Sequence, residues 1–296
     1  ARFWDVTIGD QADQRAVALV PRADGALHVV AATKTGQRVD TLVSVVDRGG
    51  TVTKQTLRTL GGEDGFAVSG VVANDNGTFL VVGGAARVSE GKTSLNFPGT
   101  VPQTFVVQPD GSVAVKPMDY GNCGNATCAT TATVKWTKGR GVSASAMDGS
   151  KLRYARFDAL GNNLGTSDPT QMTGLGAGFQ VDHLADGVAL DDWLLLFVGW
   201  GKPGSDKLQA FAAIANVGGK PGHPDFGWQR QYGGAGDDNF HAVQRTSIGG
   251  FTMAGWTTSY GSGASDGWVV ETDSQGSPLA TRSLGGLWLL QPQRTR

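Results

Sequence analysis

The chain has 296 residues, a formal net charge of −1 and only 17% charged residues. Its length is sufficient for a sizeable core, and its charge balance excludes proteins that follow the phosphates of nucleic acids or anionic membranes, which need a surplus of Lys and Arg. Its 45 glycines and 11 prolines are typical of a fold with many turns. The longest apolar run, residues 193–198, is too short to cross a membrane, so we expect neither a nucleic-acid partner nor a membrane span.

Short strands and turns recur along the chain in five units. Each unit begins with a strand of β-branched or alternating apolar residues, and a second strand follows after a turn. The expected first strands are residues 15–21, 66–73, 129–136, 178–185 and 239–246. The turn between the third and fourth strands has a glycine in every unit, at Gly50, Gly111, Gly161, Gly219 and Gly276.

The last unit is the clearest, with four strands expected at residues 240–245, 251–257, 268–272 and 279–284. Repeated four-stranded units of this length predict an all-β fold, namely a β-propeller of five antiparallel blades. We expect a single domain over residues 1–286 and a tail over 287–296. The units span about 9–60, 61–118, 119–172, 173–231 and 232–286. The alternative is one or two β-sandwiches, which also contain many short strands.

The N-terminal segment bears on how the ring closes. Residues 3–8 match the fourth strand that precedes the last unit, so terminal strand closure is expected. The last unit already has a fourth strand of its own, which leaves one outer strand in surplus. That strand either pairs as a fifth strand, displaces the other, or is donated to a partner.

Two cysteines, Cys123 and Cys128, are separated by four residues that include Gly124 and Asn125. This spacing permits a small disulfide loop, which persists in an oxidising compartment. The alternatives are two free thiols or a metal site, although a tetrahedral site needs four Cys or His ligands and the four histidines are scattered. The start ARFWDVT has neither an initiator Met nor a leader, which fits a mature exported chain or a trimmed one. We expect a periplasmic or extracellular location.

The last unit reads YGGAGDD, GGFTMAGWTTS and DGWVVETDSQGS within residues 232–277. This resembles the Gly- and Asp-rich tandem repeat of secreted bacterial β-propellers, with a GG-x-x-D start, an A-G-x-T strand and a W-V-V-x-x-D-x-x-G hairpin. Units one and two match less fully, and units three and four replace the A-G-x-T strand with VSASAMDG and LLFVGWG. The resemblance covers about half of the chain. It implies a propeller and an exported bacterial protein, and it carries no catalytic motif.

Acidic residues occur in the Gly-rich loops that would share one face of the propeller. The candidate metal ligands among them are Asp237, Asp238, Glu63 and Asp64. Ca²⁺ is the candidate ion and the only cofactor considered, because it takes about six to eight oxygen ligands and accepts backbone carbonyls of such loops. The alternative is that each Asp caps a turn by accepting hydrogen bonds from backbone N–H groups, and no D-x-D-x-D-G spacing is present.

The expected innermost strands carry few carboxylates. Asp182 lies within such a strand, and Asp75 and Asp186 lie at strand edges. Glycoside hydrolases need a pair of carboxylates, so we expect no enzyme and assign no catalytic residue. Trp200 and Trp256 recur at equivalent positions of second strands. Their rings either stack on sugar faces, as in lectins, or fill the space between blades.

The longest insertion, residues 85–103, and the apolar tail are the candidate contact elements. The expected partner-binding residues are Asn96, Phe97, Pro98, Gly99, Thr100 and Trp288. We expect a non-catalytic exported propeller that acts as a protein-binding or scaffold subunit through its loop face, with another protein or complex as partner. The first alternative is a carbohydrate-binding, lectin-like propeller with a glycan as partner. The second is a five-bladed glycoside hydrolase.

Overall fold

The computed structural model contains only strands, turns and irregular segments in the part of the chain that it describes. The described residues are 7–8, 13–35, 38–58, 66–73, 77–85, 101–110, 112–114, 129–135, 142–148, 151–157, 163–166, 170–191, 194–204, 206–216, 226–262 and 264–285. Within these ranges no helix is long and apolar enough to cross a membrane. The all-β prediction is confirmed.

The described strands form five antiparallel sheets, which we number 1 to 5 in chain order. Sheet 1 contains β1 (Asp13–Pro21), β2 (Leu27–Thr35), β3 (Arg38–Val46) and β4 (Val52–Arg58). Sheet 2 contains β5 (Phe66–Ala73), β6 (Phe79–Ala85), β7 (Val101–Val107) and β8 (Val113–Ala114). Within each sheet the strands pair in chain order, as an up-and-down meander.

The remaining three sheets repeat this order. Sheet 3 contains β9 (Ala129–Lys135), β10 (Val142–Asp148), β11 (Lys151–Phe157) and β12 (Asn163–Thr166), and the short β13 (Thr170–Gln171) pairs with β11. Sheet 4 contains β14 (Phe179–Ala189), β15 (Leu194–Pro203), β16 (Gln209–Asn216) and β17 (Phe226–Tyr232). Sheet 5 contains β18 (Asp238–Arg245), β19 (Phe251–Thr257), β20 (Asp266–Thr272) and β21 (Pro278–Leu284).

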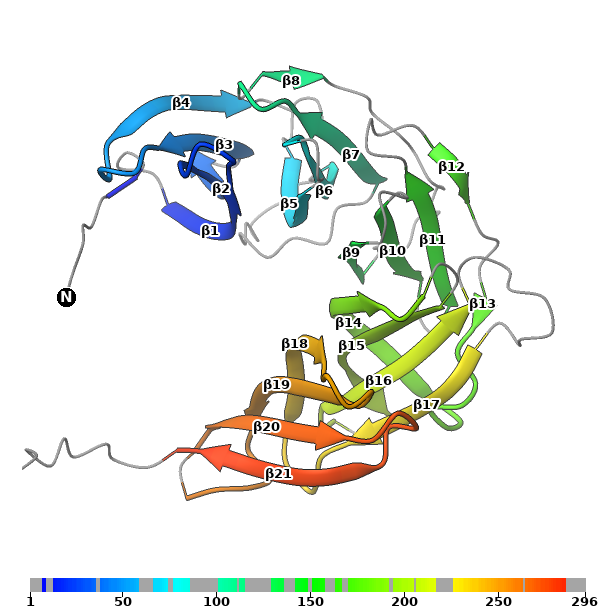
Figure 1. Cartoon of the computed structure of the whole chain (residues 1–296). Helices are drawn as coiled ribbons and strands as arrows, with labels where there is room; N and C mark the ends of the chain where they lie inside the picture. Colours follow the sequence, from blue (N-terminus) through cyan, green and yellow to red (C-terminus); the bar gives the residue numbers. More distant parts are fainter. Residues whose placement is uncertain are drawn as a thin grey trace, which may run out of the picture.

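The sheets follow one another along an open arc, with sheet 1 at one end and sheet 5 at the other (Figure 1). The first strand of each sheet lies on the concave side of the arc and the fourth strand on the convex side (Figure 1). Successive first strands are in contact, β1 with β5, β5 with β9, β9 with β14 and β14 with β18. Side-by-side sheets with their first strands at the centre are the arrangement expected of a propeller.

The core lies between neighbouring sheets rather than inside any one of them. One apolar cluster joins sheets 1 and 2 through residues such as Val43 and Phe79. A second joins Leu152 of sheet 3 to the face of sheet 4 that contains Phe211. A third joins the other face of sheet 4 to sheet 5, where Phe240 stacks on Trp268 at a centroid separation of 4.9 Å. Because sheet 4 lies between sheets 3 and 5, β16 is buried at seven of its eight positions.

The turns that set the repeat have one geometry in the first and last sheets. The N–H of Asp47 donates to Thr51 O, and the N–H of Asp273 donates to Ser277 O. The central glycines have left-handed backbones, with φ of 83° at Gly50 and 73° at Gly276, which other residues rarely adopt. The sequence therefore identified these turns through the residue type that their backbone requires.

The described strand bounds agree with the sequence-based expectation to within two residues, except for β14, which was expected over 178–185 and extends to Ala189, and for the strands beside the long insertion. The strands expected at 66–73 and 251–257 have those bounds in the structure. The insertion expected over 85–103 is shorter, because β6 ends at Ala85 and β7 begins at Val101. Of the expected closing strand 3–8, only Thr7 and Ile8 are described, and neither is in a strand.

Candidate axial site between sheets 4 and 5

Each innermost strand contains a β-bulge, and β14 contains two. The register against the second strand shifts once in β1, β5, β9 and β18. In β14 it shifts between Val181 and His183 and again between Leu184 and Asp186. Bulges redirect side chains, and they are common beside active sites. The concave edge where β14 meets β18 is therefore the most irregular part of the inner surface among the described residues.

Glycines in the second strands make these bulges possible. A Cβ at Gly199 of β15 would lie 1.9 Å from the carbonyl oxygen of His183, and one at Gly255 of β19 would lie 1.9 Å from that of Asn239. No side chain fits there, so both positions require glycine. Each glycine precedes a tryptophan, Trp200 or Trp256, and this Gly-Trp pair is the sequence signal of the bulge.

Three aromatic rings meet at this edge. His183 of β14 lies directly opposite Trp200 of β15 and stacks on it, with centroids 4.1 Å apart and planes 18° from parallel. His241, the bulged residue of β18, reaches Trp200 from the neighbouring sheet at 4.9 Å. Trp200 and His183 are partly buried, and His241 is exposed. Trp200 thus packs between two sheets, as the packing interpretation expected, while the imidazoles remain accessible.

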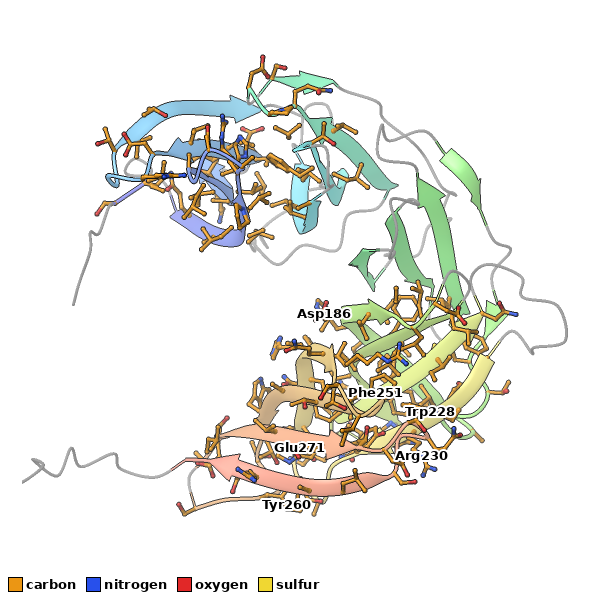
Figure 2. The ribbon with its side chains drawn as sticks, in the orientation of Figure 1. Asp186, Trp228, Arg230, Phe251, Tyr260 and Glu271 are labelled. Atoms are coloured by element: carbon orange, nitrogen blue, oxygen red, sulfur yellow. The ribbon has the colours of Figure 1, made fainter. Side chains whose placement is uncertain are left out.

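Two carboxyl groups lie on the same strand as His183. Asp182 is a bulged, exposed residue of β14, and Asp186 is partly buried. Asp186 Oδ2 accepts a hydrogen bond of 2.9 Å from the backbone N–H of Val243, on β18. Figure 2 shows Asp186 beside the open centre of the arc. Two of the three carboxylates considered for catalysis therefore lie on one innermost strand, and Asp75 is outside the described residues.

Burial shifts the protonation of two of these groups. Desolvation raises the pKa of Asp186 above its ordinary value, and the hydrogen bonds from Val243 and Gly187 only partly oppose this. Desolvation also lowers the pKa of His241. In both cases burial favours the neutral form, which is the protonated carboxyl of Asp186 and the unprotonated imidazole of His241.

The acidic pair expected to bind a metal has a different environment. Asp238 is fully buried and accepts hydrogen bonds from Gly234 N–H at 2.9 Å, from the Ser259 hydroxyl at 2.6 Å and from the Thr257 hydroxyl. Asp237 Oδ1 accepts from Leu208 N–H at 2.9 Å. No cluster of three or more His, Cys, Asp or Glu that could hold a metal is found among the described residues. Both carboxylates organise the turn that leads into β18.

The other site residues expected from sequence lie outside the described residues. These are Glu63, Asp64, Cys123, Cys128, Asn96 to Thr100 and Trp288. The disulfide and the partner-binding loop therefore stay predictions. Sequence analysis did not single out His183 and His241, which the fold brings to Trp200 from different sheets.

Comparisons with known proteins identify the fold. No protein-family model and no curated protein matches the chain. The structure of the Dos1 propeller has a TM-score of 0.51 at 10% identity, over 93% of this chain and 62% of that one. A eukaryotic initiation factor has a TM-score of 0.45 at 11% identity, over 92% of this chain and 55% of that one. The chain thus covers less than two thirds of either protein.

Several similar structures are enzymes. An α-L-arabinofuranosidase from Clostridium thermocellum has a TM-score of 0.49 at 11% identity, over 93% of this chain and 96% of that one. Others are also glycoside hydrolases. The expectation that this protein is not an enzyme was therefore wrong. It rested on the small number of carboxylates in the innermost strands, and glycoside hydrolases occur among the similar structures. At these identities the likeness to the Dos1 propeller shows the fold alone, and the chain is a β-propeller.

Proposed function

We propose that this propeller, with its five sheets as blades, binds a carbohydrate at the axial site formed by His183, Trp200, His241, Asp182 and Asp186. The observation that carries the proposal is the ring cluster, in which two imidazoles and an indole from adjacent sheets lie beside carboxyl groups. Aromatic surfaces pack against the C–H faces of sugars, and imidazole nitrogens and carboxylate oxygens exchange hydrogen bonds with hydroxyls.

The site is held in place before any ligand arrives. The ring of His183 is fixed by its stack on Trp200, and Asp186 is fixed by the Val243 N–H. Arg245 further ties the two inner strands, because its Nη1 donates to Leu190 O at 3.0 Å. Side chains that are already ordered lose little conformational entropy on binding, which favours affinity for a small polar ligand.

A titration of intrinsic tryptophan fluorescence with a panel of arabino-, xylo-, cello- and chito-oligosaccharides tests this proposal. A sugar at the axial site changes the emission of Trp200, and Trp200→Phe or His183→Ala weakens binding at least about tenfold. Trp256→Phe is the matched control, because Trp256 follows the equivalent glycine in β19 and its ring contacts no other aromatic ring among the described residues. Equal loss in both tryptophan variants, or binding unchanged by Trp200→Phe, would contradict the axial site.

Glycoside hydrolysis is the second candidate function, and the burial of Asp186 favours it. A carboxyl with a raised pKa holds its proton to higher pH than an ordinary aspartate and can donate it to a glycosidic oxygen while the C–O bond breaks. Asp182, exposed on the same strand, is the second carboxyl group that such a reaction needs.

Release of nitrophenol from aryl glycosides, with arabinofuranosides included, tests hydrolysis. Asp186→Asn and Asp182→Asn should each lower turnover by about 10²- to 10⁴-fold. Asp237→Asn is the control, since that carboxylate belongs to the turn before β18. Turnover that survives both axial substitutions would reject Asp182 and Asp186 as the groups that catalyse hydrolysis. Absence of turnover in the unsubstituted protein would reject hydrolysis and leave the binding proposal standing.

A further inference from the structure

Three side chains of β17 fasten sheet 4 to the hairpin turn of sheet 5. Trp228 Nε1 donates to Ser274 O at 2.9 Å, Arg230 Nε donates to Gln275 O at 2.9 Å, and the Tyr232 hydroxyl donates to Gly276 O at 2.7 Å. They occupy alternate positions of one strand and so share a face. Figure 2 shows Trp228 and Arg230 near Phe251 of sheet 5, and the rings of Trp228 and Phe251 are 6.0 Å apart.

This joint uses carbonyl groups that the turn itself leaves without partners. The turn from Asp273 to Ser277 satisfies its own N–H groups, since Gln275 and Ser277 both donate to Asp273 Oδ1 at 2.8 Å. Its three central carbonyls accept from β17 instead. A Cβ at Gly276 would lie 2.7 Å from the Trp228 ring, so the turn also fits the strand closely. The joint therefore fits a turn of the Asp-x-x-Gly type, whose central carbonyls point outward.

β21 is the strand of sheet 5 that corresponds to β17, and it shares the central arginine of the joint. β17 and β21 both have seven residues and both precede a Gly-Gly pair, which aligns Trp228, Arg230 and Tyr232 with Ala280, Arg282 and Leu284. Arg282 is exposed and makes no hydrogen bond or ion pair to the described part of the chain. Leu284 is 57% exposed, whereas Tyr232 at the aligned position is buried. Sheet 5 therefore has the fastening strand, and within the described ranges no turn packs against it.

Sheet 1 carries a turn of the matching kind. In the β3–β4 turn, Gly49 and Thr51 donate to Asp47 Oδ1 at 2.9 and 2.8 Å, the same bonds as in the fastened turn. Arg48, Gly49 and Thr51 are exposed. Figure 1 places sheets 1 and 5 at opposite ends of the open arc, so in this structure the turn does not reach β21 of its own chain.

We propose that a second copy of this chain docks head to tail, with its Asp47–Thr51 turn on the β21 surface formed by Ala280, Arg282 and Leu284. Arg282 then donates to the carbonyl of Gly49 in the second copy, as Arg230 does to Gln275. Ala280 and Leu284 have no side-chain donor where β17 has Trp228 and Tyr232, so they form apolar contacts with the turn. The interface therefore keeps the arginine-to-carbonyl bond of the joint between sheets 4 and 5 and replaces its other two hydrogen bonds by apolar packing. A heterologous contact of this kind forms a ring or an open chain of subunits.

Sedimentation velocity across a range of protein concentrations is the first test. We expect species heavier than the 30.7 kDa chain at high concentration, and Leu284→Asp and Arg282→Glu should abolish them. Leu279→Asp is the matched control, because Leu279 is 64% exposed on the same strand and aligns with Gly227, outside the joint. Far-UV circular dichroism confirms that the variants fold. A chain that stays monomeric at all concentrations overturns the proposal.

A cysteine pair identifies what reaches β21. In Gly49→Cys/Arg282→Cys, the added Cβ at position 49 meets only the Asp47 side chain, whose Oδ1 at 3.3 Å must shift by a few tenths of an ångström to admit it. Oxidation should give a ladder of covalent oligomers that the unsubstituted chain does not give. A cross-linked monomer would show that the arc closes on its own turn and would overturn the second copy as occupant. The absence of any new cross-link would overturn the docking itself.

Discussion

Asp238 and Asp186 lie on neighbouring innermost strands and have opposite surroundings. Asp238 is fully buried; its Oδ2 accepts hydrogen bonds from the Gly234 N–H and the Ser259 hydroxyl, and its Oδ1 accepts one from the Thr257 hydroxyl. Asp186 is partly buried at the concave edge, with a single hydrogen bond from another sheet. The acidic residue within the clearest sequence motif therefore has a structural role. In the proposed function, Asp186, which lies outside any motif, is the acidic residue that contacts the ligand.

Asp238→Ala is the largest expected perturbation and tests the structural half of this comparison. It leaves the Gly234 N–H and the hydroxyls of Thr257 and Ser259 without their acceptor in a buried turn. We expect the free energy of unfolding to fall by about 3 kcal/mol, measured by urea denaturation. Asp237→Ala should cost about 1 kcal/mol, because that residue is partly exposed and loses mainly the Leu208 N–H bond. Equal losses would mean that burial of Asp238 contributes nothing.

Much of the fold was predictable because its turns and strands each need particular residue types, which can be read in the sequence. The left-handed backbones of Gly50 and Gly276 need glycine, and the strands around them need alternating or β-branched residues. These residue types predict where the strands and turns lie within each unit. They do not encode whether the first and last sheets meet, because that depends on small rotations between sheets that accumulate along the arc.

The axial site was less predictable, because bulges decide which residues face the centre. Two register shifts in β14 place Asp182, His183 and Asp186 in ways that strict alternation does not anticipate. The stack of His183 on Trp200 and the contact from His241 join residues of three strands in two sheets. The one local signal is the Gly-Trp pair of β15 and β19, which marks where a bulged strand approaches.

Trp200→Ala is the next largest perturbation and tests whether the axial rings also stabilise the joint between sheets. The substitution removes the stack with His183 and the contact with His241. We expect a loss of about 2 kcal/mol in the free energy of unfolding. Trp256→Ala should lower the free energy of unfolding by about 1 kcal/mol less than Trp200→Ala does, because Trp256 has no aromatic ring contacts to lose within the described residues. If both variants lose the same stability, the ring contacts of Trp200 have only a ligand-binding role.

Asp186→Asn sharpens the comparison through pH. Because the folded-state pKa of Asp186 lies above the ordinary value of 3.8, the folded protein binds more protons than the unfolded chain between the two values. The stability of the unsubstituted protein relative to Asp186→Asn should therefore fall as pH rises through that window, and then stay constant. Denaturant unfolding of both proteins at several pH values measures this. Asp24→Asn should show the opposite sign, since the hydrogen bonds from Arg22 lower the pKa of exposed Asp24. A difference independent of pH would place Asp186 in an environment like that of a solvated carboxylate.

His241→Gln should have the smallest effect. Desolvation lowers the pKa of His241 below its ordinary value of 6.5, so between the two values the unfolded chain binds more protons than the folded protein. The stability of the unsubstituted protein relative to His241→Gln should rise with pH through this window and level off above 6.5. Thermal unfolding of both proteins on either side of the window gives the difference, and the imidazole resonances of His241 give its midpoint directly. Since the same desolvation depends on the packing of His241 against Trp200, Trp200→Ala should return that midpoint toward the ordinary value. A midpoint unchanged by Trp200→Ala would separate the imidazole from the ring cluster and remove it from the axial site.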